Sequence, residues 1–336
     1  MTRRVGENGQ PLDTLKLTRF FNLGFNWLPY SWTNSFYERD LNRFFDHEKY
    51  NLKPKHRAFA QHVMVNDTLP NRILSGMVIV KNNITRFDED GVLFDGDTEI
   101  TKCDAVIFAT GYMFDYPFLP KEILKIEKNQ VNLYKYIFNP DLPHPETLPI
   151  LGLIQPVGGG FPAGEAQIRW CMELLKGTVS LPSKEAMWKD IKAEKEFRKW
   201  RFHEGEKHTV EVDWINYLDD IYSQFGAKPN LWWYFFTDFP LWVKLMFGPS
   251  LPYQYRLQGP GKWDGARHAI MTAQERIDYP LNTRKLRDEN VFKSKLESAK
   301  EENHGFLIRL IAPIIGVISP IVVYFLNERV KVFKSN

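Results

Sequence analysis

The pattern of hydrophobic and polar positions contains one short apolar run that predicts a strand. Residues 105–108 are four consecutive apolar residues, which is typical of a strand buried on both faces of a sheet. The run ends in Ala109, Thr110 and Gly111, small residues at the point where the chain must turn. Glycine accepts positive φ, or the close approach of another group, because it has no Cβ. We therefore expect a buried strand that ends in a turn at Gly111.

Three other segments also have strand patterns. Residues 77–81 and 91–94 predict two strands, and Asp95-Gly96 predicts the turn from the second of them into a following strand. Residues 148–154, LPILGLI, predict another buried strand. Combined with the helical segments elsewhere in the chain, these strands predict an α/β fold.

Helical spacing of apolar positions recurs in four segments. Pro162 suits the first turn of one of these helices, and Gly177 and Gly226 are placed to end two of them. The predicted helices cover residues 32–45, 163–175, 183–200 and 214–225.

A glycine-rich loop separates the strand predicted at residues 148–154 from the helix predicted at residues 163–175. Gln155 opens this loop, and Gly158, Gly159 and Gly160 follow. A helix N-terminus after such a loop presents unpaired N–H groups and the positive end of the helix dipole. The arrangement predicts a site for an anionic or electron-rich ligand.

Two apolar stretches near the C-terminus each admit two interpretations. Residues 232–251 are too aromatic for a solvated loop, and form either a helical core or a surface that faces substrate or membrane. Residues 310–326 carry no charge, and with residues 306–308 they would form a helix of roughly 31 Å at ~1.5 Å per residue. That length crosses a hydrocarbon core of about 30 Å, so we expect a membrane helix at residues 306–326 rather than a buried soluble helix.

Composition and charge exclude several classes of function. A net charge of +3 over 336 residues, with no block of lysine and arginine, does not indicate nucleic-acid binding. The two cysteines, Cys103 and Cys171, cannot build a disulfide framework, and we expect both to be reduced. The polar N-terminus has no apolar stretch of the kind that signal peptides contain.

Three segments of the chain have a distinctive order and spacing. Residues 103–120 read CDAVIFATGYMFDYPFLP, and residues 47–81 read HEKYNLKPKHRAFAQHVMVNDTLPNRILSGMVIVK. The third segment is GLIQP at residues 152–156, with Gln167, Arg169 and Trp170 in the helix that follows. Together these segments resemble the flavin-containing monooxygenases. The resemblance implies the C-terminal part of a flavoprotein with two dinucleotide-binding domains, a helical insertion and a C-terminal membrane helix.

The resemblance also implies a division of the chain. The expected parts are a mostly helical insertion at residues 1–77, the end of an NADPH-binding domain at 78–112, a returning part of an FAD-binding domain at 113–180, a helical region at 181–303 and a membrane anchor at 306–326.

The resemblance further implies FAD and NADPH as cofactors, with O2 as co-substrate. Its substrates would be small lipophilic amines or sulfides, oxygenated at nitrogen or sulfur, and its location the endoplasmic reticulum membrane. Self-association is left open. Neither of the G-x-G-x-x-G fingerprints of the family is found in this sequence. We therefore expect an N-terminally truncated chain that does not turn over NADPH by itself.

Candidate site residues follow from the same resemblance. Thr110, Gly111, Gly158, Gly159 and Gly160 are expected to contact the cofactor, and no metal site is predicted. His62 and Gln155 are the catalytic candidates, because imidazole and amide side chains can both donate and accept hydrogen bonds. A supporting role for His62 at the surface is equally open, and Glu48 is expected to partner a nearby base.

Two other functions stay open beside oxygenation of nitrogen or sulfur. A histidine at position 62 favours a Baeyer–Villiger-type oxygenation of ketones on the same scaffold. A non-catalytic, membrane-tethered protein would keep the same fold as a binding surface.

Overall fold

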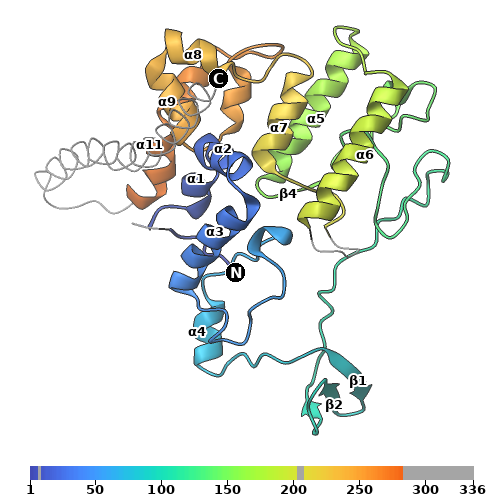
Figure 1. The fold of residues 1–336 in the computed structure, drawn as a ribbon, viewed down its shortest axis with the longest axis vertical. Coiled ribbons are helices and arrows are strands. Elements are labelled where there is room, and N and C mark those ends of the chain that lie inside the picture. Colours follow the sequence, from blue (N-terminus) through green and yellow to red (C-terminus); the bar gives the residue numbers. More distant parts are fainter. Residues whose placement is uncertain (7–8, 203–207, 283–336) are drawn as a thin grey trace, which may run out of the picture. The chain divides into compact units, whose positions relative to one another are not determined.

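The computed structural model describes residues 1–6, 9–202 and 208–282 (Figure 1). The chain divides into two compact units, Met1–Thr272 and Ala273–Asn336. In the second unit the described residues form helix α11 (Ala273–Asp278) and the 3-10 helix η5 (Tyr279–Asn282). The membrane helix predicted at residues 306–326 lies outside the described residues. Among the helices that are described, none combines the length and the apolar character needed to span a bilayer.

The first part of the chain is helical. Helix α3 confirms the helix predicted at residues 32–45, and Pro29 precedes its first residue, where a missing N–H costs nothing. Thr18 caps α2 by accepting a hydrogen bond from the Phe21 N–H at 3.2 Å. The elements are α1 (Leu12–Lys16), α2 (Arg19–Trp27), α3 (Tyr30–Phe44), the 3-10 helix η2 (Ala58–Ala60) and α4 (Leu69–Leu74).

A small antiparallel sheet follows these helices. Strand β1 (Ile84–Asp88) pairs with β2 (Gly91–Phe94), and β2 pairs with β3 (Thr101–Lys102). The strand predicted at residues 91–94 is confirmed, as is the turn after it, where Gly96 has a φ of 83°. The strand predicted at residues 77–81 is wrong. The two-residue turn before β2 selects residues 84–88 as its partner, which leaves residues 77–81 without a ladder.

The strand predicted at residues 105–108 is also wrong. These residues form no regular element, and Ile107 and Phe108 are 90% and 69% exposed. A strand of a parallel sheet needs hydrogen bonds from neighbouring strands on both sides. Within the described residues no strand pairs with this segment, so its apolar character alone does not make it a strand.

The second buried strand is much shorter than predicted. Residues 148–154 form no strand, and only β4 (Gln155–Pro156) pairs, in parallel with β5 (Glu211–Val212). The pairing is limited to two residues of each strand. The described residues therefore keep the α/β mixture of helices and strands, but not the buried parallel strands that the sequence predicts.

Three helices enclose the main core. They are α5 (Gly160–Leu175), α6 (Lys184–Arg201) and α7 (Trp214–Ser223), and they confirm the helices predicted from residues 163, 183 and 214 (Figure 1). The side chain of Ser183 caps α6 by accepting from the Ala186 N–H, and Gly177 follows α5 with a φ of 71°. The irregular segment 131–138 adds Ile137 and Phe138, both fully buried, to the same core. It runs on to the 3-10 helix η3 (Pro145–Thr147).

A second core lies among α8 (Leu231–Thr237), α9 (Phe239–Phe247), η4 (Pro252–Arg256) and α10 (Ala266–Met271). The aromatic stretch 232–251 was predicted to be either a helical core or an exposed surface, and each interpretation fits part of it. Leu241 and Leu245 of α9 are buried in this core, whereas Trp232 and Phe236 of α8 are 76% and 77% exposed.

The two cysteines are expected to differ in reactivity. Cys171 lies buried in α5, and this burial raises the pKa of its thiol to about 11, whereas Cys103 is exposed. At pH 8 only about one Cys171 thiol in a thousand would be thiolate, the reactive form. We expect a disulfide reagent to titrate one thiol in the native chain and the second only in denaturant. Rapid modification of both thiols in the native chain would contradict this burial.

Candidate functional site

The glycine-rich loop opens at the N-terminus of α5. Gly159 occupies the N-cap position and provides no side-chain hydrogen bond, and Gly158, Gly159 and Gly160 are exposed. Phe161, in the first turn, is 96% exposed. The first-turn N–H groups of a 16-residue helix are therefore available to a ligand, with the positive end of the helix dipole behind them.

Trp214 supports this loop from the start of α7. Its Nε1–H donates to the Gly159 carbonyl at 2.9 Å, and a Cβ added to Gly158 would lie 2.5 Å from the Trp214 indole. Glycine at position 158 is therefore required for close approach of the loop to α7, and the indole fixes the path of the loop.

Substitution of Gly158 is expected to show how much the fold depends on the close packing of this loop against Trp214. We expect Gly158→Ala to lower the free energy of unfolding by about 1–3 kcal/mol, because the new methyl group overpacks against the indole. Gly160→Ala is the matched control, since a Cβ there would meet nothing within 4 Å. Urea unfolding followed by tryptophan fluorescence would measure both. Equal stabilities of the two variants would contradict the packing.

The structure brings the two catalytic candidates together through a third residue. His62 Nδ1 lies 3.2 Å from Glu211 Oε1, and Glu211 in β5 pairs with Gln155 in β4. His208 Nδ1 lies 3.3 Å from the other carboxylate oxygen of Glu211. The His62 and His208 rings are nearly parallel, with 6.3 Å between their centroids. The predicted sites at positions 62 and 155 therefore share one neighbourhood.

Glu211 was missed by reasoning from the sequence. The available signal was weak: Glu211 stands between two valines, and Asp213 follows directly after them. The Glu211 side chain is only 2% exposed. A carboxylate is seldom buried unless it has partners, so its burial in the fold, and not the sequence around it, marks a polar site.

Thr110 and Gly111 lie apart from this group in the sequence, and within the described part of the chain no hydrogen bond or ion pair joins them to it. Both are exposed, and Gly111 has a φ of 92° with no atom within 4 Å of an added Cβ. Their predicted role at the cofactor stays a prediction. Glu48 bonds Lys53 at 2.9 Å, which confirms it as the partner of a nearby base.

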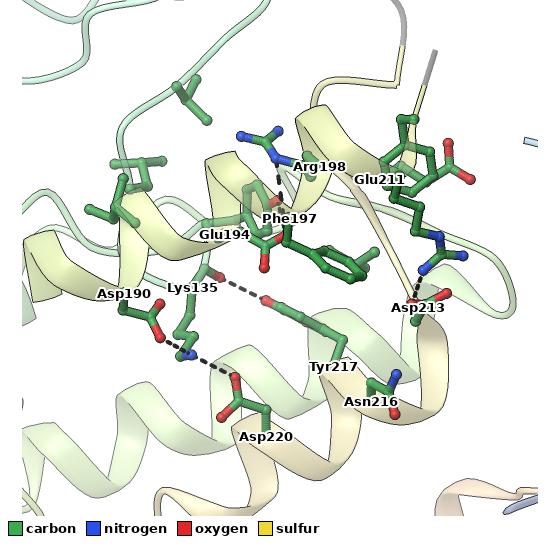
Figure 2. A pocket seen from close by; sticks show the side chains of 17 residues that line it. Lys135, Asp190, Glu194, Phe197, Arg198, Glu211, Asp213, Asn216, Tyr217 and Asp220 are labelled. Carbon is green, nitrogen blue, oxygen red and sulfur yellow. Dashed lines mark hydrogen bonds and ion pairs between the residues drawn. The ribbon is translucent and has the colours of Figure 1, made fainter. Parts of the chain in front are cut away.

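A cavity of about 170 Å³, lined by both charged and apolar side chains, lies between α6 and α7 (Figure 2). Figure 2 shows Lys135 and Asp190 at one end and Glu211 and Asp213 at the other. Lys135 bridges Asp190 at 2.6 Å and Asp220 at 2.8 Å. Burial acts to lower the pKa of Lys135, but the two carboxylates together hold it above its ordinary value. This end of the cavity is therefore a structural ion-pair cluster.

The middle of the cavity holds a carboxyl group, that of Glu194, whose partners do not fully offset the cost of burying its charge. Burial raises the pKa of Glu194, which accepts a hydrogen bond from the Tyr136 hydroxyl at 3.1 Å. Arg198 Nε lies 4.0 Å from Glu194 and has no hydrogen-bond partner among the described residues. Arg201 pairs with Asp213 at the β5 end. Glu211 is thus the acid of this cavity that contacts histidines.

Comparison with known proteins places the chain in a family. The profile of the flavin-binding monooxygenase-like family matches residues 1–316. The flavin-containing monooxygenase 5 of Cavia porcellus is 48% identical over 85% of this chain and 54% of its own length. Dimethylaniline monooxygenase (N-oxide-forming) 2 of the same organism is 44% identical over 84% of this chain and 53% of its own length.

A solved structure also aligns with part of the chain. It is the S-allyl-L-cysteine S-oxygenase of Allium sativum, with 25% identity and a TM-score of 0.39 over 58% of this chain and 43% of that one. The chain spans about half the length of the two Cavia porcellus relatives. Because the family profile covers nearly all of its residues, the chain belongs to the flavin-binding monooxygenase-like family.

Proposed function

We propose that this chain provides part of a flavin-dependent monooxygenase. The enzyme uses NADPH and O2 to oxygenate nitrogen or sulfur in small lipophilic amines and sulfides. The observation that carries the proposal is the match of residues 1–316 to the family, whose members use FAD and NADPH. The N-oxide-forming relative supports oxygenation at nitrogen. The finer division of the chain at residues 77, 112, 180 and 303 belongs to the same proposal.

The residues of the site fit one part of the flavin. The exposed, uncapped N-terminus of α5 can direct N–H groups at the electron-rich edge of the ring, and the glycines at 158–160 leave room for it. The diphosphates of FAD and NADPH need a strand, a G-x-G-x-x-G turn and a helix, which the described residues do not contain. This chain therefore fits the ring-facing part of the cofactor site and not its diphosphate-binding part.

We assign roles only to groups of this chain. Bound FAD would supply the oxygen-transfer chemistry, with NADPH as its reductant. The loop of Gly158, Gly159 and Gly160 would position the ring, and Thr110 and Gly111 would border the cofactor. Gln155 would donate or accept a hydrogen bond at the strand end, and His62 would hold a proton or a hydrogen bond beside the substrate.

A second function, oxygenation of ketones to esters, has one observation in its favour. The imidazole of His62 is held against a buried carboxylate, so its outer nitrogen is available to hydrogen-bond a carbonyl substrate. Turnover of a ketone would separate this function from N- or S-oxygenation.

The test of the proposed function compares two proteins. One is the 336-residue chain, and the other is that chain joined to the part of the Cavia porcellus relative that the match leaves uncovered. Flavin absorbance, NADPH oxidation and O2 uptake are measured with dimethylaniline and with a ketone. Formation of the N-oxide by the joined protein supports the proposal, and an ester from the ketone supports the second function. Absence of bound flavin from both proteins would overturn it in favour of a non-catalytic role.

We also propose that residues 306–326 anchor the protein in the endoplasmic reticulum membrane. The uncharged run at residues 310–326, with Arg329, Lys331 and Lys334 after it, supports this. Deletion of the residues after Asn303 is expected to move the protein into the soluble fraction after a carbonate wash. Membrane association that survives the deletion would show that this segment is not the anchor. The exposed aromatic side chains of α8 would then be the next candidates for the membrane contact.

A further inference from the structure

Glu211 is a buried carboxylate that lies between two imidazoles. Its side chain is 2% exposed, and its Oε1 forms a hydrogen bond of 3.2 Å with His62 Nδ1. His208 Nδ1 lies 3.3 Å from Oε2, close enough for an ion pair, but this contact is not a hydrogen bond. The His62 side chain is 32% exposed. One imidazole of the pair is therefore accessible from outside, while the carboxylate that holds it is not.

The chemistry of a carboxylate fixes which nitrogen carries the proton. An ionised carboxylate has no hydrogen to donate, so the His62 Nδ1 that is hydrogen-bonded to it must be the donor. In a neutral His62 ring the proton then sits on Nδ1, and Nε2 keeps its lone pair. We propose that Glu211 is a positioning residue that fixes the Nδ1–H tautomer and the orientation of His62, so that Nε2 is the nitrogen that acts.

The backbone of Glu211 is itself fixed to the glycine-rich loop. Val210 O accepts from the Gln155 N–H at 2.8 Å, and Val212 O accepts from the Val157 N–H at 3.2 Å. The carboxylate therefore emerges from β5 at a register set by β4, directly before the loop at residues 158–160. Glu211 connects the accessible imidazole of His62, 149 residues away in sequence, to the same strand pair that carries Gln155.

The contact with His62 also helps the carboxylate to tolerate burial. An isolated carboxylate in such a place would be strongly destabilising, and the Nδ1–H of His62 offsets part of that cost. The other oxygen, Oε2, has no hydrogen-bond partner among the described residues. The nearby guanidinium of Arg201 is paired with Asp213 instead. The part of this proposal that concerns oxygenation rests on the proposed function, whereas the tautomer of His62 does not.

The test reads the tautomer directly. Long-range ¹H–¹⁵N spectra of the ¹⁵N-histidine-labelled full chain are recorded over a pH series and read at its alkaline end, where each ring is neutral. A His62→Gln variant identifies the signals of His62. We expect the Nδ1–H pattern for His62 in the unaltered chain. An Nε2–H pattern for His62 would overturn the proposal.

Glu211→Gln makes the test specific for the carboxylate. An amide has an NH2 donor as well as an acceptor oxygen, so it no longer requires His62 Nδ1 to be the donor. We expect an Nε2–H signal to appear for His62 in this variant. A His62 ring that keeps the pure Nδ1–H pattern both in this variant and in Glu211→Leu would overturn the proposal. A merely structural role for Glu211 would not produce such a switch.

Two further variants complete the design. Glu194→Gln alters another carboxyl group of the same cavity that forms no hydrogen bond or ion pair with His62 among the described residues, and it should leave the His62 tautomer unchanged. Glu211→Leu removes the acceptor, and we expect loss of the Nδ1–H preference of His62. None of these spectra requires bound FAD. Failure of oxygenation with an intact His62 tautomer would therefore count against the proposed function alone.

Discussion

Replacement of Arg19 by methionine is expected to lower the free energy of unfolding by about 3 kcal/mol, the lower end for a broken buried ion pair. Arg19 in α2 is only 3% exposed. Its guanidinium donates to Asp219 at 2.5 Å and to Gln254 Oε1 at 3.1 Å. Methionine would leave the fully buried Gln254 oxygen without this donor. Asp219 would keep the Tyr255 hydroxyl as a donor at 2.8 Å, which moderates the loss.

An exposed ion pair provides the matched control for Arg19. Lys16 and Asp40 lie 2.9 Å apart, and both side chains are 36% exposed. Lys16→Met should therefore cost at most about 1 kcal/mol. Guanidinium unfolding at fixed salt would measure both variants, with equal m-values as the condition for comparison. A loss for Arg19→Met no larger than that for Lys16→Met would show that Arg19 does not secure α2 to α7 and η4.

Helices were predictable from the sequence because their determinants are local. The spacing of apolar residues in residues 183–200 and a serine at position 183 are enough to place α6 and its first turn. Strands depend on a partner that may lie far away in the chain. The apolar run at residues 105–108 satisfies every local criterion, yet the described residues provide no strand beside it. The partner of β4 comes from residues 211–212, which no local pattern indicated.

The candidate site also has a part that local sequence predicts and a part that depends on distant contacts. The loop at Gly158, Gly159 and Gly160 follows from the order of apolar run, glycines and helix, and the structure confirms that it opens at the start of α5. His62 came only from resemblance to a family. The contact between His62 and Glu211 spans 149 residues, so only the fold could reveal it.

The second large effect is expected for Trp170 at the centre of α5. Trp170→Ala should lower the free energy of unfolding by about 3–5 kcal/mol, the range for truncation of a buried tryptophan. The indole is 1% exposed and meets Phe138 edge-on at 5.1 Å and Tyr134 at 5.9 Å. It therefore joins α5 to the irregular segment 131–138, whose internal strand-like pairing is limited to a bridge between Tyr134 and Phe138. Thermal unfolding and near-ultraviolet circular dichroism would report the loss.

Ile168→Ala provides the control, because Ile168 lies in the same helix but is 50% exposed. Alanine is a better helix former than isoleucine, so this variant should stay within about 0.5 kcal/mol of the unaltered chain. If Trp170→Ala loses stability and Ile168→Ala does not, the loss comes from the aromatic contacts and not from the helix itself. Similar small changes in both variants would mean that segment 131–138 is stabilised without Trp170. The core would then depend mainly on the contacts of α7, through Leu218, Ile221 and Tyr222.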